Sequence, residues 1–80
     1  MSMNRTRFWP ETEQSAITRA IRKVGCPEAD VDVYSVEEYP DEFWVEFENE
    51  RTRRVCVVIV DRASGAARLS SVNGVEVEDE

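Results

Sequence analysis

The sequence predicts an α+β domain in which one N-terminal helix packs on an antiparallel meander sheet of four strands, or five with a short last strand. Three observations lead to this fold class. Apolar residues recur at helical spacing near the start of the chain. Later stretches alternate or run apolar over strand lengths, and glycine, proline and asparagine separate those stretches. One helix, several strands and short turns together favour a helix lying on one face of the sheet.

At 80 residues, the chain is long enough for one domain and too short for two. Hydrophobic residues make up 41% and charged residues 34%, and both charge signs are present, so a folded chain is expected. We therefore expect a single domain over residues 1–80, with loosely ordered ends at 1–9 and 78–80.

The helix is expected over residues 10–24. Its apolar residues recur three or four positions apart, at Ile17, Ala20, Ile21 and Val24. Pro10 suits the first helical turn, where its missing N–H is no loss. Gly25 can adopt the left-handed conformation that ends many helices, and Pro27 prevents continuation.

The strands follow in the rest of the chain, and their expected ranges are 31–36, 43–48, 54–61, 66–72 and 75–77. In the first strand, the alternation predicts Val31 and Val33 on one face and Tyr34 and Val36 on the other. The third strand is apolar at every position from 55 to 60, as is typical of a central strand that is covered on both sides.

We expect the helix to cover one face of the sheet. The predicted core residues are Ile17, Ile21, Val24, Phe43, Val45, Phe47, Val55, Val57, Ile59 and Leu69. One helix is too narrow for both faces, so the opposite face is expected to show Tyr34, Trp44, Cys56, Val58 and Val60. A slip of one residue in a strand would exchange its two faces.

The apolar strip on that opposite face is the candidate functional site. Such strips often mark protein contacts, and tryptophan and tyrosine are common anchors there. The predicted partner-binding residues are Tyr34, Asp41, Glu42, Trp44, Glu46, Glu48 and Val58. Two alternatives stay open, namely cover within the chain by Phe8 and Trp9 or by the 37–42 loop, and homodimerisation through the strip.

The net charge of −7 bears on the class of partner. An acidic surface repels phosphate backbones and anionic lipid, so direct nucleic-acid binding and membrane binding are not expected. A protein with a basic patch is the expected partner. A second hypothesis is a nucleic-acid mimic or regulator that binds a basic protein through the acidic segment 28–50. The plainest interpretation of the charge is solubility.

No arrangement of residues indicates catalysis or a cofactor. Histidine is absent, and with it the commonest general base and metal ligand. Cys26 and Cys56 fit no zinc or redox spacing, and burial of Cys56 in an apolar strand should raise its pKa. The carboxylates of 37–42 lack the spacing of a calcium-binding loop. We expect no enzyme and no metal site.

The location expected from the sequence is the cytoplasm. No stretch approaches the roughly 20 apolar residues that a membrane-spanning helix needs. The first residues, 1–14, include Arg5, Arg7, Glu11 and Glu13 and lack the apolar run of a signal peptide.

Residues 16–70 resemble a PepSY-like domain. The residues that carry this resemblance are Ala16, Ala20, Val24 and Gly25 in the helix, Phe43 to Phe47 in the aromatic strand, and Val58 to Gly65 in the apolar strand and its turn. Segments 44–47 and 59–66 are also similar to the YrhB-like immunity proteins of bacterial toxin systems. Both resemblances imply a helix-on-sheet fold and a role in binding or inhibiting another protein, and the immunity proteins have no catalytic residues to carry over.

Overall fold

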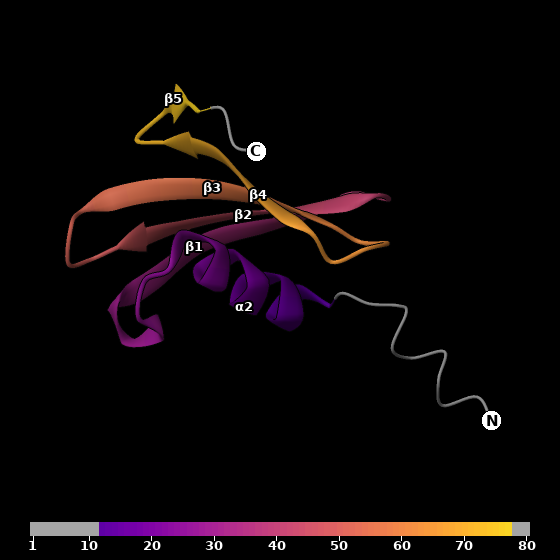
Figure 1. The fold of residues 1–80 in the computed structure, drawn as a ribbon, viewed down its shortest axis with the longest axis horizontal. Coiled ribbons are helices and arrows are strands. Elements are labelled where there is room, and N and C mark those ends of the chain that lie inside the picture. The colour runs from indigo at the N-terminus through magenta and orange to yellow at the C-terminus, as the bar shows by residue number, and fades with distance from the viewer. Residues whose placement is uncertain (1–11, 78–80) are drawn as a thin grey trace.

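A computed structural model describes residues 12–77 and shows one α-helix packed on a five-stranded antiparallel sheet (Figure 1). The strands lie in chain order, β1-β2-β3-β4-β5, which confirms the predicted α+β meander. The elements are α2 (Glu13–Val24), a 3-10 turn η1 (Glu28–Asp30), β1 (Val31–Glu38), β2 (Glu42–Asn49), β3 (Arg54–Asp61), β4 (Ala67–Val72) and β5 (Val75–Glu76).

The helix α2 begins at Glu13, three residues later than the sequence suggested. Thr12 is its N-cap, since the Thr12 hydroxyl accepts the backbone N–H of Ser15 at 3.2 Å and the Ser15 hydroxyl accepts the N–H of Thr12 at 3.0 Å. The helix ends as expected at Gly25, which has φ 81° and donates its N–H to the Ile21 carbonyl at 2.9 Å.

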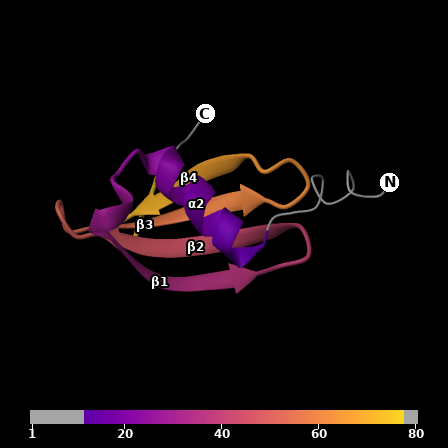
Figure 2. The same ribbon diagram turned by 90° about the horizontal axis from the view of Figure 1, so that it is seen from below.

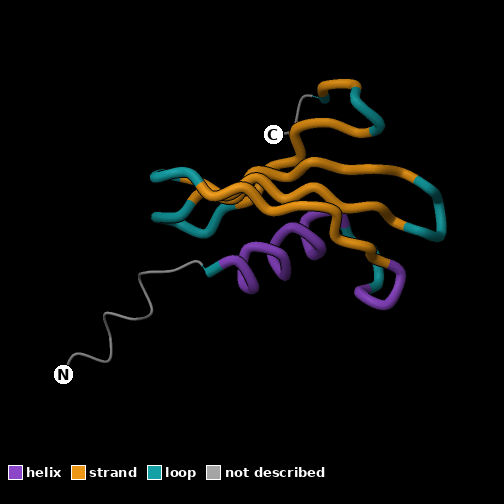
Figure 3. Tube along the Cα trace, turned by 180° about the vertical axis from the view of Figure 1, so that it is seen from behind, coloured by secondary structure: helices purple, strands orange, loops and turns teal. Residues whose placement is uncertain are grey.

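The helix crosses one face of the sheet obliquely, while the other face has no helix among residues 12–77 (Figures 2 and 3). Ala16 and Ala20, one turn apart, are fully buried against the sheet. Because alanine is small, the helix backbone can approach the strands closely. Larger helix residues, Ile17 and Val24, pack at the margins of the core and are only partly buried.

The turn between β2 and β3 sets which residues of β3 face the helix. Four residues, 50–53, connect the strands, so Asn49 pairs with Arg54 and Phe47 with Cys56. The buried cluster under the helix is therefore Ala16, Ala20, Phe43, Val45, Phe47, Cys56, Val58 and Val60. The expectation that Val55, Val57 and Ile59 face the helix is wrong, because pairing those residues with the odd-numbered core residues of β2 would require a turn of odd length.

The edge strand β1 contains a β-bulge. Val33 pairs with Phe47, yet Ser35 pairs with Glu46, so Tyr34 is an extra residue in β1. The bulge restores Val36 to the helix side, where it packs against the core as Val31 does. The predicted placement of Val36 on the same face as Tyr34 is therefore wrong.

Two expectations lie outside the described residues. These are the loose ordering of 1–9 and 78–80, and the cover of the sheet by Phe8 and Trp9. Within residues 12–77, no helix combines the length and the apolar character needed to cross a membrane.

Candidate functional site

The sheet face turned away from α2 is called here the open face. Its residues include Tyr34, Ser35, Glu37, Glu42, Trp44, Glu46, Glu48, Val55, Val57, Ile59 and Arg68. On the central hairpin, Trp44 lies opposite Ile59 and Glu46 lies opposite Val57. The open face is thus apolar along β3 and acidic along β2 apart from Trp44.

Trp44 is the third residue of β2, close to the β1–β2 loop, and has 36% of its surface exposed. Its indole N–H donates to the Glu42 carboxylate at 2.8 Å, and its ring meets that of Tyr39 edge-on, with centroids 5.6 Å apart. Such edge-to-face pairs are favourable beyond the area they bury. Trp44 is therefore held in one orientation while much of its surface stays accessible.

A clamp on the β1–β2 loop fixes the position of Tyr39. The Arg62 guanidinium donates to the Glu38 carboxylate and to the Tyr39 carbonyl, each at 2.8 Å, and lies over the Phe43 ring at 4.8 Å from its centroid. Sequence reasoning missed Tyr39 as a neighbour of Trp44. An aromatic residue beside Pro40 in the loop that follows β1 was the available signal.

The predicted cover of the open face by the 37–42 loop holds in part. The rings of Tyr39 and Trp44 meet edge-to-face, but both residues remain exposed by more than a third. Ile59 is only 5% exposed although none of the helices described within residues 12–77 lies above it. Its cross-strand neighbours are Trp44 and Arg68, whose long side chains flank it. The face is shielded at Ile59 and accessible at Trp44.

Glu48 has a role within the fold. It is 9% exposed, the lowest value among the described charged residues. One of its oxygens accepts the Tyr34 hydroxyl at 2.5 Å, and the other lies 3.2 Å from Nε of Arg53. The hydrogen bond to Glu48, followed by burial, raises the pKa of Tyr34 above its ordinary value. The pair anchors the bulged residue of β1 to β2.

The three open-face carboxylates next to Trp44, those of Glu37, Glu42 and Glu46, have no arginine or lysine within 4 Å among residues 12–77. They accept hydrogen bonds from Tyr39, Trp44 and Ser35 instead. Neutral donors leave the full negative charge in place. These three carboxylates therefore form no ion pair with a described basic side chain.

Two predicted site residues remain, Asp41 and Val58, and the structure places them in different environments. Asp41 is exposed in the loop between β1 and β2, next to Glu42. Val58 is fully buried under the helix, so its prediction as a partner-binding residue is wrong. Cys56 and Val60 are buried in the same core rather than on the open face. Their expected place is taken by Val57 and Ile59, because of the four-residue turn.

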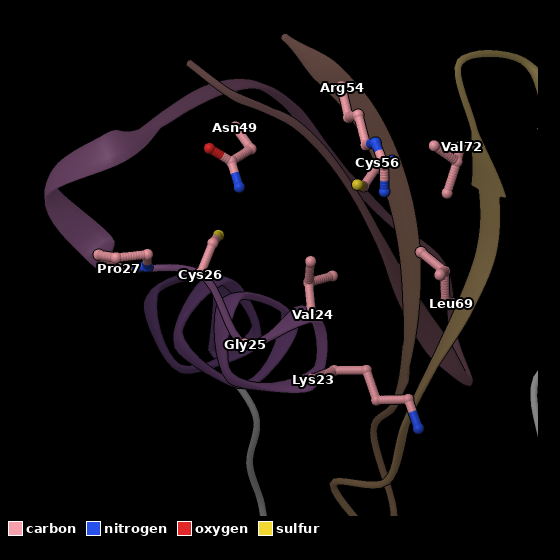
Figure 4. Close-up of a pocket in the computed structure, with 10 residues that line it drawn as sticks. All are labelled: Lys23, Val24, Gly25, Cys26, Pro27, Asn49, Arg54, Cys56, Leu69 and Val72. Carbon is pink, nitrogen blue, oxygen red and sulfur yellow. The ribbon is translucent and has the colours of Figure 1, made fainter. Parts of the chain in front are cut away.

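The two cysteines lie on the helix side of the sheet, where both line a cavity at the end of α2 (Figure 4). Both are free thiols, and burial raises the pKa of each. The predicted direction for Cys56 is confirmed. Among residues 12–77, no group of three or more cysteine, aspartate or glutamate side chains is placed to hold a metal ion.

No protein-family model, curated protein or solved structure matches this chain. The resemblances to PepSY-like domains and to YrhB-like immunity proteins stay predictions. The open face is therefore the feature from which a function is inferred.

Proposed function

We propose that this chain is a non-enzymatic protein-binding module, of an inhibitor-like or immunity-like kind, whose open face contacts a protein with a basic patch. The observation that carries the proposal is Trp44. It is accessible and held in one orientation, and uncompensated carboxylates surround it. Interfaces commonly place an aromatic anchor centrally within a polar rim.

The contacts of Trp44 with Glu42 and Tyr39 reduce the side-chain entropy that Trp44 would lose on binding a partner. A side chain that is already fixed by Glu42 and Tyr39 loses little rotamer freedom when a partner packs on it. Val57 extends the apolar surface next to Trp44 along β3 and is itself half-buried. Together they offer an apolar centre on which a partner can exclude water.

The charge of the face selects the partner. Glu37, Glu42 and Glu46 carry negative charge without a described basic neighbour, and the chain as a whole has a net charge of −7. A basic surface is attracted and an acidic one repelled, and this effect acts mainly on the association rate. Both family resemblances also imply binding or inhibition of a protein. The proposal includes a cytoplasmic location, where thiols stay reduced.

A nucleic-acid mimic that binds a basic protein is the second candidate function. It is supported by the same uncompensated carboxylates on β1 and β2. A mimic depends on charge and has little need of an apolar anchor. The effect of Trp44→Ala on binding therefore distinguishes the two functions.

The test is affinity capture with three baits: the native chain, the double variant Trp44→Ala/Glu46→Lys, and the control Glu28→Lys. Glu28 is exposed in η1, on the helix side of the sheet (Figure 3), so its variant tests general charge effects. We expect one defined basic protein to bind the native chain and the Glu28→Lys variant, to be lost from the double variant, and to dissociate as salt rises.

The single variants Trp44→Ala and Glu46→Lys, used as separate baits, distinguish the two candidate functions. Capture that survives Trp44→Ala but fails with Glu46→Lys would favour the mimic. Equal capture by the native chain and the double variant, with circular dichroism showing both folded, would contradict the proposed face. A self-associated chain as the only species captured would favour the homodimer.

A further inference from the structure

A cavity of about 510 Å³ lies on the helix side of the sheet, between the C-terminal end of α2 and strands β3 and β4 (Figure 4). Its volume falls within the range of small-molecule sites, about 300–1,000 Å³. Apolar side chains form much of its wall, including Val24, Leu69 and Val72. The thiols of Cys26 and Cys56 complete that surface from opposite sides.

The charge of the cavity lining differs from that of the whole chain. Lys23 and Arg54 are the charged residues of the described lining, which includes no aspartate or glutamate, although the chain has 17 acidic residues and 10 basic ones. No described carboxylate lies within 4 Å of the Arg54 guanidinium. The Arg54 guanidinium thus lines the cavity without an ion pair to a described carboxylate.

The space at the helix end is available to a ligand. Gly25 forms part of the lining, and a side-chain carbon placed there would meet no atom within 4 Å. The Ile21 carbonyl next to this end already accepts the Gly25 N–H, so one of the last helix carbonyls is satisfied within the fold. The amide of Asn49, at the end of β2, adds a neutral hydrogen-bonding group to the lining.

The geometry points to a binding site for a small amphipathic anion, such as a medium-chain carboxylate. Its apolar tail would lie between Val24, Leu69 and Val72, and its carboxylate would meet the Arg54 guanidinium. Guanidinium groups bind carboxylates with charge-assisted hydrogen bonds. This site lies across the sheet from the open face and is independent of the function proposed above.

The test is titration of the full chain with octanoate and, separately, with octan-1-ol, followed by amide NMR. We expect octanoate to shift the signals of Val24, Cys26, Cys56 and Val72 in a saturable way, and to bind about tenfold more tightly than octan-1-ol, since the alcohol lacks the anion. Octanoate should also slow alkylation of Cys26 by N-ethylmaleimide.

The matched variants are Arg54→Glu and Arg68→Glu. Arg54 lies on the helix side and Arg68 on the open face, and both are exposed. Arg54→Glu should weaken octanoate binding about tenfold or more, while Arg68→Glu should leave it unchanged. Equal affinities for octanoate and octan-1-ol, or equal effects of the two variants, would overturn the proposal.

A segment of the chain itself is the alternative occupant of the cavity. In the full chain with Phe8→Ser and Trp9→Ser, octanoate should bind as it does to the native chain. Binding that appears only in this double variant would show that the cavity is filled by residues 1–11, and the ligand-site proposal would be wrong.

Discussion

Strand β3 contributes side chains to both faces of the sheet, and these side chains are buried to different extents on the two faces. On the helix side, Val58 is fully buried beneath α2, whereas its chain neighbour Val57 lies half-buried on the open face. Both are valine, and both occur in a run that is apolar at every position. The difference teaches that residue type alone does not separate a core position from a position on the open face here. The length of the turn between β2 and β3 decides which residues of β3 face the helix.

The largest expected effect comes from placing a charge at these two neighbouring positions. Val58→Asp buries an unpaired carboxylate in the core and should cost more than about 4 kcal/mol, comparable with the whole stability of a chain of this length. Val57→Asp, at the solvent-facing side of the sheet, should cost about 1 kcal/mol. Chemical denaturation measures both. An unfolded Val57→Asp beside a folded Val58→Asp would reverse the assigned register.

A smaller difference is expected between two aromatic residues of β2. Phe47 is fully buried, so Phe47→Ala should lower the free energy of unfolding by about 3–5 kcal/mol. Trp44→Ala removes a partly exposed ring with one ring contact and one hydrogen bond, and should lower it by no more than about 2 kcal/mol. Equal losses in urea denaturation would mean that Trp44 serves mainly the fold.

The smallest effect concerns the proton of Tyr34 on the open face. Its hydrogen bond to Glu48 raises its pKa above the ordinary value of 10.0. The folded chain therefore holds this proton more tightly than the unfolded chain does. The resulting stabilisation is present below pH 10 and is lost as pH rises through the higher pKa of the folded state.

The measurement uses the Tyr39→Phe variant, in which Tyr34 is the one remaining tyrosine. Near-ultraviolet absorbance should show Tyr34 ionising at a higher pH than tyrosine in the urea-unfolded chain. Adding Glu48→Gln should bring its pKa back toward the unfolded value. An unchanged pKa in the Glu48→Gln variant would contradict the hydrogen bond as the cause.

The order of the helix and strands was predicted correctly from the sequence because the signals for helices, strands and turns are local. Gly25 ended the helix through its own backbone freedom, and the alternation of Phe43, Val45 and Phe47 correctly placed these residues under the helix. Leu69 also packs against the core, as expected. These features required no knowledge of how distant segments pair.

The face of β3 could not be predicted in the same way. A strand that is apolar throughout has no alternation, so only the turn of residues 50–53 decides which side chains lie inside. For the same reason Val58 was misplaced, and Val57 and Ile59 were missed as open-face residues. Tyr34 and Trp44 were placed correctly, but the contacts of Trp44 with Tyr39 and of Tyr34 with Glu48 depend on the loop and the bulge.

The bulge in β1 also bears on how this chain behaves when concentrated. A regular outer strand offers its unpaired amides and carbonyls as a template for another strand, which is a common start of fibril growth. In β1 the extra residue Tyr34 interrupts that template, and acidic side chains repel a second copy. At the opposite edge, β5 spans only Val75 and Glu76. Neither border favours strand-by-strand polymerisation.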